Sequence, residues 1–132
     1  MEKIFRVFVV ANVVAFSIYV IIPYIDSIFH SNEALDILAY SGYGAIIKLP
    51  SIYQWFSTLI WLPVSLGMFY YNSIARTLFL VLTIFFALTS TLHGFVVLTG
   101  YEVMVYEFTT LLDGVILTMA YFTSVSEKFK KA

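Results

Sequence analysis

Residues 4–25 read IFRVFVVANVVAFSIYVIIPYI, an apolar run whose body is interrupted only by Asn12, Ser17 and Pro23. A helix that crosses a bilayer needs about 20 mostly apolar residues. The run is too long for the core of a typical secretory signal, and bulky residues stand where a cleavage site would need small ones. The stretch therefore predicts a retained membrane-spanning helix.

Three further stretches of the sequence have the same character. Residues 51–71 carry Pro63 near their middle, residues 74–98 form the longest and cleanest run, and residues 102–124 are the only run with acidic residues. The composition agrees, since 61% of the residues are hydrophobic and 11% are charged, against roughly half and a quarter in soluble domains. We expect a single all-α domain of 132 residues, a polytopic membrane protein with four transmembrane helices in an antiparallel bundle.

The connections between the four runs are unequal in length. Tyr71-Asn72-Ser73 and Thr99-Gly100-Tyr101 predict tight turns, so the last three spans should follow one another as an antiparallel meander. Residues 26–50 form the only sizeable loop between spans. We therefore expect any structure outside the bilayer to be concentrated in this loop.

A short helix is predicted inside the loop of residues 26–50. Ser31 or Asn32 can cap it, and Glu33 stands in its first turn, where the helix dipole favours an acid. The segment 41–44, Ser-Gly-Tyr-Gly, then breaks it. Because one side of this helix is apolar, we expect it to lie in the interface of the outer leaflet.

The basic residues predict the orientation of the chain in the membrane. Only Lys48 falls on the side of the long loop. The other six basic residues fall on the opposite side: Lys3, Arg6, Arg76, Lys128, Lys130 and Lys131. Loops rich in Lys and Arg stay in the cytoplasm, so both termini are predicted to be cytoplasmic, and a bacterial inner membrane suits the size and the charge asymmetry.

Ionisable groups at membrane depth are costly and usually face the protein interior, so we examine them first for function. If the last two spans fold back about Gly100, His93 and Glu107 lie at equal depth, roughly 10 Å from the turn at a rise of about 1.5 Å per residue. The sequence therefore predicts a hydrogen bond or ion pair between His93 and Glu107. Such a pair either locks the two helices together or serves a proton or a ligand.

The same depth count predicts a polar layer near the centre of the bilayer. Asp113 lies about halfway along the fourth span, and Asn12 and Thr83 fall at similar depth on the first and third spans. Pro63 blocks the hydrogen bond to the carbonyl of Leu59 and leaves that group available. We therefore predict a mid-membrane polar layer of Asn12, Thr83 and Asp113 beside a helix kink at Pro63.

Small residues follow one stripe on each of the last two predicted spans. They are Thr83, Ala87, Ser90 and Gly94 on the third span, and Thr110, Gly114 and Thr118, together with Glu107, on the fourth. Small residues at this spacing let membrane helices approach closely. We therefore expect Glu107 on the packed face, with Asp113 about 120° away and facing the first or second span or a partner protein.

Several classes of function are disfavoured by the sequence. The formal net charge of −1 argues against nucleic acid as a partner. The absence of cysteine excludes thiol catalysis and iron–sulfur clusters, and His30 and His93 alone offer little for metal or haem ligation. Without a nucleophile–base set or a phosphate loop, we expect a protein that is not an enzyme and holds neither a cofactor nor a metal.

Three functions stay open. The first is a small non-enzymatic membrane protein that binds another membrane protein, as an accessory or immunity-type subunit. The second is a homo-oligomeric transporter or ion-conducting unit in which Glu107, His93 and Asp113 carry protons. The third is a lipid- or quinone-handling subunit that uses a carboxylate–histidine pair as acid and base. The bilayer itself, and a membrane-protein partner or a second copy, are the predicted contacts.

Overall fold

The computed structural model describes residues 1–46 and 52–130, with only the backbone described at residue 27 and at residues 52–56. Lys48 and the predicted start of the second span at residue 51 therefore lie outside the described residues. All regular structure within the described ranges is helical, which confirms the all-α class. The elements are α1 (Glu2–Phe29), α2 (Asn32–Leu38), α3 (Ile52–Phe69), α4 (Ser73–Ser90), α5 (Gly100–Phe122) and the 3-10 helix η1 (Ser124–Lys130).

Three of the helices are long and apolar enough to cross a membrane. They cover Glu2–Asp26, Ser73–Ser90 and Gly100–Phe122. The apolar part of α3 whose side chains are described, Ser57–Phe69, is shorter. These helices support an integral membrane protein, because most of their side chains face outward and a chain in water would not expose so many apolar groups.

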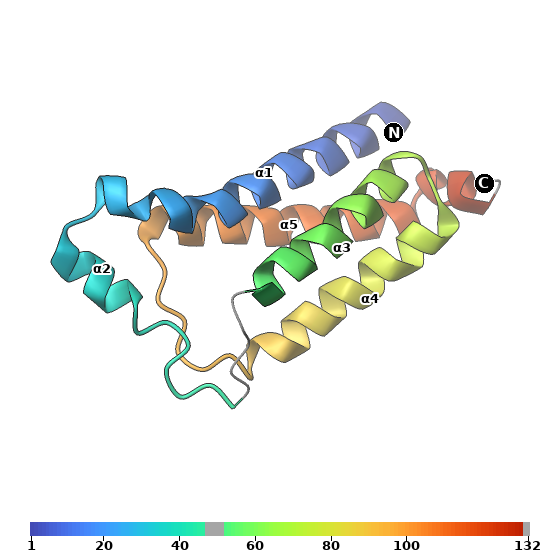
Figure 1. The fold of residues 1–132 in the computed structure, drawn as a ribbon. Helices are drawn as coiled ribbons and strands as arrows, with labels where there is room; N and C mark the ends of the chain where they lie inside the picture. The colour runs from blue at the N-terminus through green and yellow to red at the C-terminus, as the bar shows by residue number, and fades with distance from the viewer. Residues whose placement is uncertain (47–51, 131–132) are drawn as a thin grey trace.

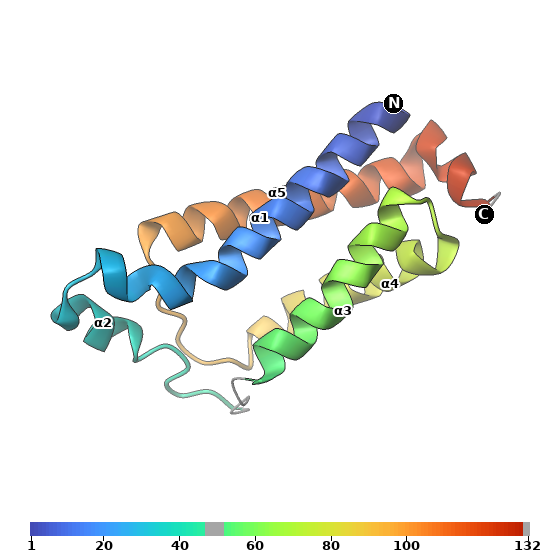
Figure 2. The same ribbon diagram turned by 45° about the horizontal axis from the view of Figure 1, so that its top comes forward.

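The helices pack in two pairs that share a core. Figures 1 and 2 both draw α1 alongside α5 and α3 alongside α4. The α1–α5 contact is the most extensive, and α1 also packs against α3. Rings and aliphatic side chains from all four helices and η1 fill the shared core, among them Phe5, Trp61, Phe79, Ile116 and Phe129.

The turn between α3 and α4 is as tight as predicted. Tyr71 adopts a left-handed φ of 60°, and the side chain of Asn72 accepts hydrogen bonds from the backbone N–H groups of Ile74 and Ala75 at 2.9 and 3.1 Å. A Cβ added at Gly67 would lie 2.4 Å from the Cβ of Ala75. The two helices therefore meet at a distance that only glycine allows at position 67.

The predicted end of the third span is wrong. Helix α4 ends at Ser90, and residues 91–99 form a connection to α5 in place of a tight turn at residues 99–101. The hydroxyls of Ser90 and Thr91 bond carbonyls in the last turn, and Gly94 takes a left-handed φ of 76° that does not continue a helix. Hydropathy alone predicts a longer helix, because the residues from Phe95 to Leu98 are all apolar.

Residues 91–99 pair with the loop that follows α2. The N–H of Gly42 bonds the carbonyl of Phe95 at 2.7 Å, and the N–H of Phe95 bonds the carbonyl of Tyr43 at 2.9 Å. The N–H of Ile46 reaches the carbonyl of Leu92 at 3.0 Å. We call the paired segments 42–46 and 92–97 the loop seam; both run together at one end of the molecule in Figure 1.

The short helix predicted in the long loop is present. Helix α2 begins after Ser31, whose hydroxyl accepts a hydrogen bond from the N–H of Ala34, and Glu33 lies in its first turn. A run of turns follows from Ala39 to Gly44, where the sequence predicted the break. Leu35 and Leu38 are half-buried, and none of its residues is fully buried.

We predict that Gly94→Ala destabilises the protein. A Cβ at this position would lie 2.5 Å from the backbone nitrogen of Ala45 and from the carbonyl oxygen of Tyr43, and the left-handed φ adds strain of about 1–3 kcal/mol. The free energy of unfolding in micelles, followed by circular dichroism, should fall by at least that amount. Gly100→Ala is the control, because a Cβ there meets nothing within 4 Å, and an equal loss in both variants would contradict the prediction.

Candidate functional site

Asn12 and Asp113 meet in the middle of the α1–α5 contact. Asn12 is fully buried, and its side-chain amide donates to Oδ1 of Asp113 at 2.8 Å and to the carbonyl of Thr109 at 3.3 Å. Asp113 itself is half-buried. The structure thus brings together two of the three residues of the predicted central layer, and turns Asp113 toward the first span.

The other members of the predicted layer lie apart from this pair. The Thr83 hydroxyl bonds the carbonyl of Phe79 within its own helix at 2.9 Å. Pro63 lies inside α3, as predicted, but its ring is exposed on the surface of the helix. Among the described residues, neither Thr83 nor Pro63 has a recorded contact with the Asn12–Asp113 pair, so the polar contact joins two helices only.

The predicted packed face of α5 is wrong. Glu107, Thr110, Gly114 and Thr118 are all exposed, and the buried residues of α5 lie on the opposite side, from Thr109 and Leu112 to Ile116 and Ala120. The reason is the choice of neighbour, because α5 packs mainly on α1 and only slightly on α4. We call the exposed set of Glu107, Thr110, Gly114 and Thr118 the α5 outer stripe.

His93 lies in the connection of residues 91–99 and not on a helix. The depth count that paired it with Glu107 assumed a turn at Gly100, which the structure does not have. Within the described part of the chain, no hydrogen bond or ion pair joins His93 to Glu107. The predicted pair therefore loses the geometry on which it was based.

A second polar cluster, which the sequence reasoning missed, joins the end of α1 to the start of α5. The Tyr101 hydroxyl donates to Oδ1 of the buried Asp26. His30 Nε2 lies 2.8 Å from the same hydroxyl, and the His30 and Tyr101 rings stack with centroids 5.6 Å apart. The spacing of Asp26 and His30, four residues apart at a helix end, was the available signal.

The start of α5 is fixed by a capping box beside this cluster. The Thr99 hydroxyl accepts from the N–H of Glu102, and Oε2 of Glu102 accepts from the N–H of Thr99 at 2.6 Å. Glu102 is 4% exposed, and Oε2 of its carboxylate accepts hydrogen bonds from both the N–H and the hydroxyl of Thr99. The Thr-x-x-Glu spacing predicts such a box, although the sequence analysis treated residues 99–101 as a turn only.

The opposite end of the molecule is held by cations over aromatic rings. The Arg6 guanidinium lies 5.0 Å from the ring centre of Phe69, and that of Arg76 lies 4.8 Å from the ring centre of Tyr121. Lys128 in η1 reaches Glu2 in α1 at 3.0 Å. These contacts tie the start of α1 to the α3–α4 turn and to η1, which the sequence analysis did not predict as a separate element.

The polar side chains of the described residues form hydrogen-bonded pairs and one cluster of three, and they do not form a metal centre. Within residues 1–46 and 52–130, no three histidine or carboxylate side chains gather as metal ligands would. Comparison with family models, with curated proteins and with solved structures found no match.

We predict an energetic coupling between Asn12 and Asp113. In a double-mutant cycle of Asn12→Ala and Asp113→Ala, the coupling free energy of unfolding should lie between about 0.6 and 1.7 kcal/mol, the average and the maximum for hydrogen bonds between membrane helices. The measurement is unfolding in micelles of the two single variants and the double variant. Asn12→Ala with Thr118→Ala is the control cycle and should be additive within about 0.5 kcal/mol; equal coupling in both cycles would exclude a specific bond.

We also predict that Tyr101→Phe weakens the contact between the ends of α1 and α5. The change removes the hydroxyl between Asp26 and His30 and leaves a buried carboxylate short of a donor, at a cost of about 1–3 kcal/mol. Unfolding in micelles measures the loss, with the exposed Tyr40→Phe as the control. If both variants lost the same stability, the cluster would contribute nothing specific.

Proposed function

We propose that this protein is a non-enzymatic membrane subunit that binds another membrane protein through the α5 outer stripe. The exposure of Glu107 on this stripe is the observation that carries the proposal. A carboxylate facing lipid at the depth of a spanning helix costs about 3 kcal/mol or more, and such groups normally face protein or water. A helix of a partner laid on the stripe would remove Glu107 from lipid.

The rest of the stripe supports the same reading. A Cβ at Gly114 would meet nothing within 4 Å, so the chain itself gives no packing reason for a glycine that weakens a helix interior by about 1 kcal/mol. Thr110, Gly114 and Thr118 are spaced by four, the spacing of small residues at close membrane-helix contacts. The hydroxyls of Thr110 and Thr118 bond carbonyls of α5 itself, which leaves the surface small and smooth.

The polar pair inside the chain supports a binding role rather than a reaction. Asn12 and Asp113 bond each other between α1 and α5. Near the end of α1, the Tyr101 hydroxyl of α5 contacts both Asp26 and His30. Each cluster holds two helices together. Helices held in this way give the α5 outer stripe a fixed position on the surface of the protein.

We further propose that α3 also crosses the bilayer, giving four spans in an antiparallel bundle with both termini cytoplasmic. Helix α3 has 18 residues, about 27 Å at the rise of an α-helix. The start of α1 and the end of α5 lie at the same end of the molecule in both views (Figures 1 and 2), which an even number of spans requires. The six-to-one bias of basic residues supports the orientation, and a bacterial inner membrane suits it.

Single-cysteine crosslinking tests the α5 outer stripe. The chain has no cysteine, so Thr110→Cys and Gly114→Cys each introduce one thiol on the stripe. We expect a thiol-reactive benzophenone attached to either cysteine to link, on irradiation in native membranes, to a partner identified by mass spectrometry. Val14→Cys, on the exposed face of α1, is the control at similar depth, and crosslinking no stronger on the stripe than at Val14 would exclude the proposal.

The same experiment distinguishes a different partner protein from a second copy of this chain, which the alternative of a homo-oligomeric transporter requires. A second copy on the stripe would give a band at twice the 15.1 kDa of the chain and would place two Glu107 carboxylates near each other. Proton flux into liposomes should then fall in Glu107→Gln and stay unchanged in Val14→Ala, which lies on the exposed face of α1 outside the stripe. Flux that persists in Glu107→Gln would leave the protein-binding role as the better account.

A further inference from the structure

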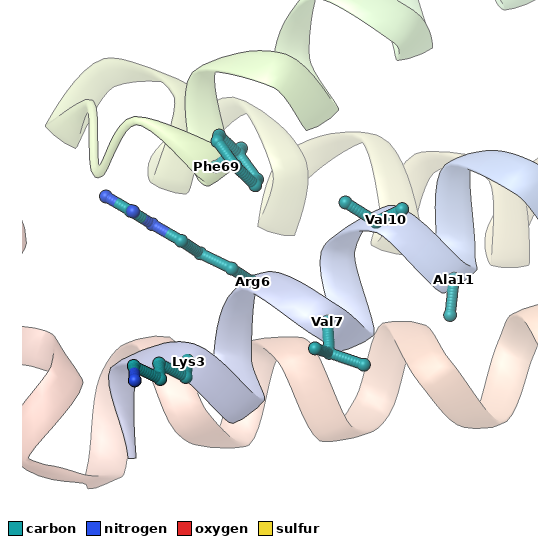
Figure 3. A pocket seen from close by; sticks show the side chains of 6 residues that line it. All are labelled: Lys3, Arg6, Val7, Val10, Ala11 and Phe69. Carbon is teal, nitrogen blue, oxygen red and sulfur yellow. The ribbon is translucent and has the colours of Figure 1, made fainter.

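A shallow groove runs along the exposed face of α1 near its start, with the end of α3 at its edge. Figure 3 shows its lining, with Lys3, Arg6, Val7, Val10 and Ala11 from α1 and Phe69 from the end of α3. Its volume is about 480 Å³, and it is open along one side. The groove is open to the surroundings along the exposed Val7 and Val10, so a molecule in the bilayer can enter it sideways.

The positive charges of the groove are free of acidic partners. The described residues give neither Lys3 nor Arg6 an ion pair, whereas Lys128 at the same end is bonded to Glu2. The Arg6 guanidinium lies over the rings of Phe69 and Tyr71, with its carbon 5.0 and 5.1 Å from their centres. The rings contact the flat face of the guanidinium and leave its N–H groups available. Two of these N–H groups can donate parallel hydrogen bonds to one phosphate.

The order of side chains along the groove follows the order of groups in a phospholipid. Lys3 and Arg6 occupy the first two turns of α1, and Val10 lies seven residues after Lys3, about 10 Å further along the helix. The lining of the groove is therefore apolar, and the charged ends of the two cations lie at its margin near the start of the helix. A soluble anion would use only this margin.

We propose that this groove binds an anionic glycerophospholipid, with its phosphate at Lys3 and Arg6 and one acyl chain along Val7, Val10 and Phe69. Basic pockets between membrane helices at the bilayer surface bind anionic headgroups in this way. The proposal rests on the part of the proposed function that places α1 in a bilayer. It needs neither the α5 outer stripe nor the orientation of the chain.

Native mass spectrometry of the full chain in mild detergent tests the proposal. The protein is titrated with phosphatidylglycerol and with phosphatidylcholine of the same acyl chains, and separately with inorganic phosphate. We expect phosphatidylglycerol to bind selectively. Each Lys or Arg at an anionic surface contributes about fivefold in affinity, so Lys3→Gln should lower binding about fivefold and Lys3→Gln with Arg6→Gln about thirtyfold.

Two further variants distinguish binding in the groove from attraction of the lipid to the positive charge at this end of the protein. Lys130→Gln removes one exposed positive charge at the same end but outside the groove, and it should leave binding unchanged. Ala11→Trp fills the apolar part and keeps both cations, so it should weaken phosphatidylglycerol binding without changing net charge. Circular dichroism checks the fold of each variant, and Arg6→Lys retains a cation should Arg6→Gln unfold.

Three results would overturn the proposal. Equal affinity for the two lipids would exclude recognition of the headgroup charge. An equal loss in Lys130→Gln and Lys3→Gln would show attraction to the whole basic end rather than a site. Binding of inorganic phosphate as tight as that of phosphatidylglycerol, together with full lipid binding by Ala11→Trp, would show an anion site without an acyl groove. None of these results affects crosslinking at the α5 outer stripe, so the two proposals fail separately.

Discussion

Asn12 donates its amide to Asp113 in the middle of the α1–α5 contact, and this bond sets the rotation of both helices. Lipid offers no partner to an amide or a carboxylate, so the two side chains have to point toward each other. Once Asn12 faces inward, Phe5 and Val9 on the same side of α1 are buried with it. Once Asp113 faces α1, the opposite side of α5 is left on the surface.

Further contacts at the two ends of the molecule hold α1 in place, in addition to the bond between Asn12 and Asp113. At one end Tyr101 joins Asp26 and His30 across the α1–α5 contact. At the other, the aromatic rings of Phe5, Tyr71 and Phe129 stack edge and face. The contact between α1 and α5 is thus held at two heights by polar groups. The rings join α1 to the α3–α4 turn and to η1, while α3 and α4 pack against α1 and α5 as a second pair.

Part of this arrangement could be predicted from the sequence, and the reasons differ from one feature to the next. Hydropathy predicted the apolar helices, and the Ser31 cap predicted α2, because both signals are local. The equal depth of Asn12 and Asp113 was also predictable, because depth follows from counting residues along spans. The end of α4 at Ser90 was not, because hydropathy does not reveal the left-handed φ of Gly94 or the pairing with a distant loop, which together draw the apolar residues after Ser90 out of the helix.

The face of α5 could not be predicted for a different reason. A stripe of small residues allows close packing but does not say whether the neighbour is in the same chain. In water the more polar side of a helix turns outward, but lipid is as apolar as leucine and gives no such preference. Glu107 was predicted to face inward because a charge in contact with lipid is costly, whereas the contact between Asn12 and Asp113 determines the opposite rotation of α5.

The loop seam has a consequence for the order in which the protein is assembled. The segments 42–46 and 92–97 are about fifty positions apart, and both α3 and α4 lie between them in the chain. Closing so long a loop has an entropic cost that is recovered only when the intervening helices are in place. Because the chain is synthesised from its N-terminus, the loop seam can therefore close only after both α3 and α4 have been made.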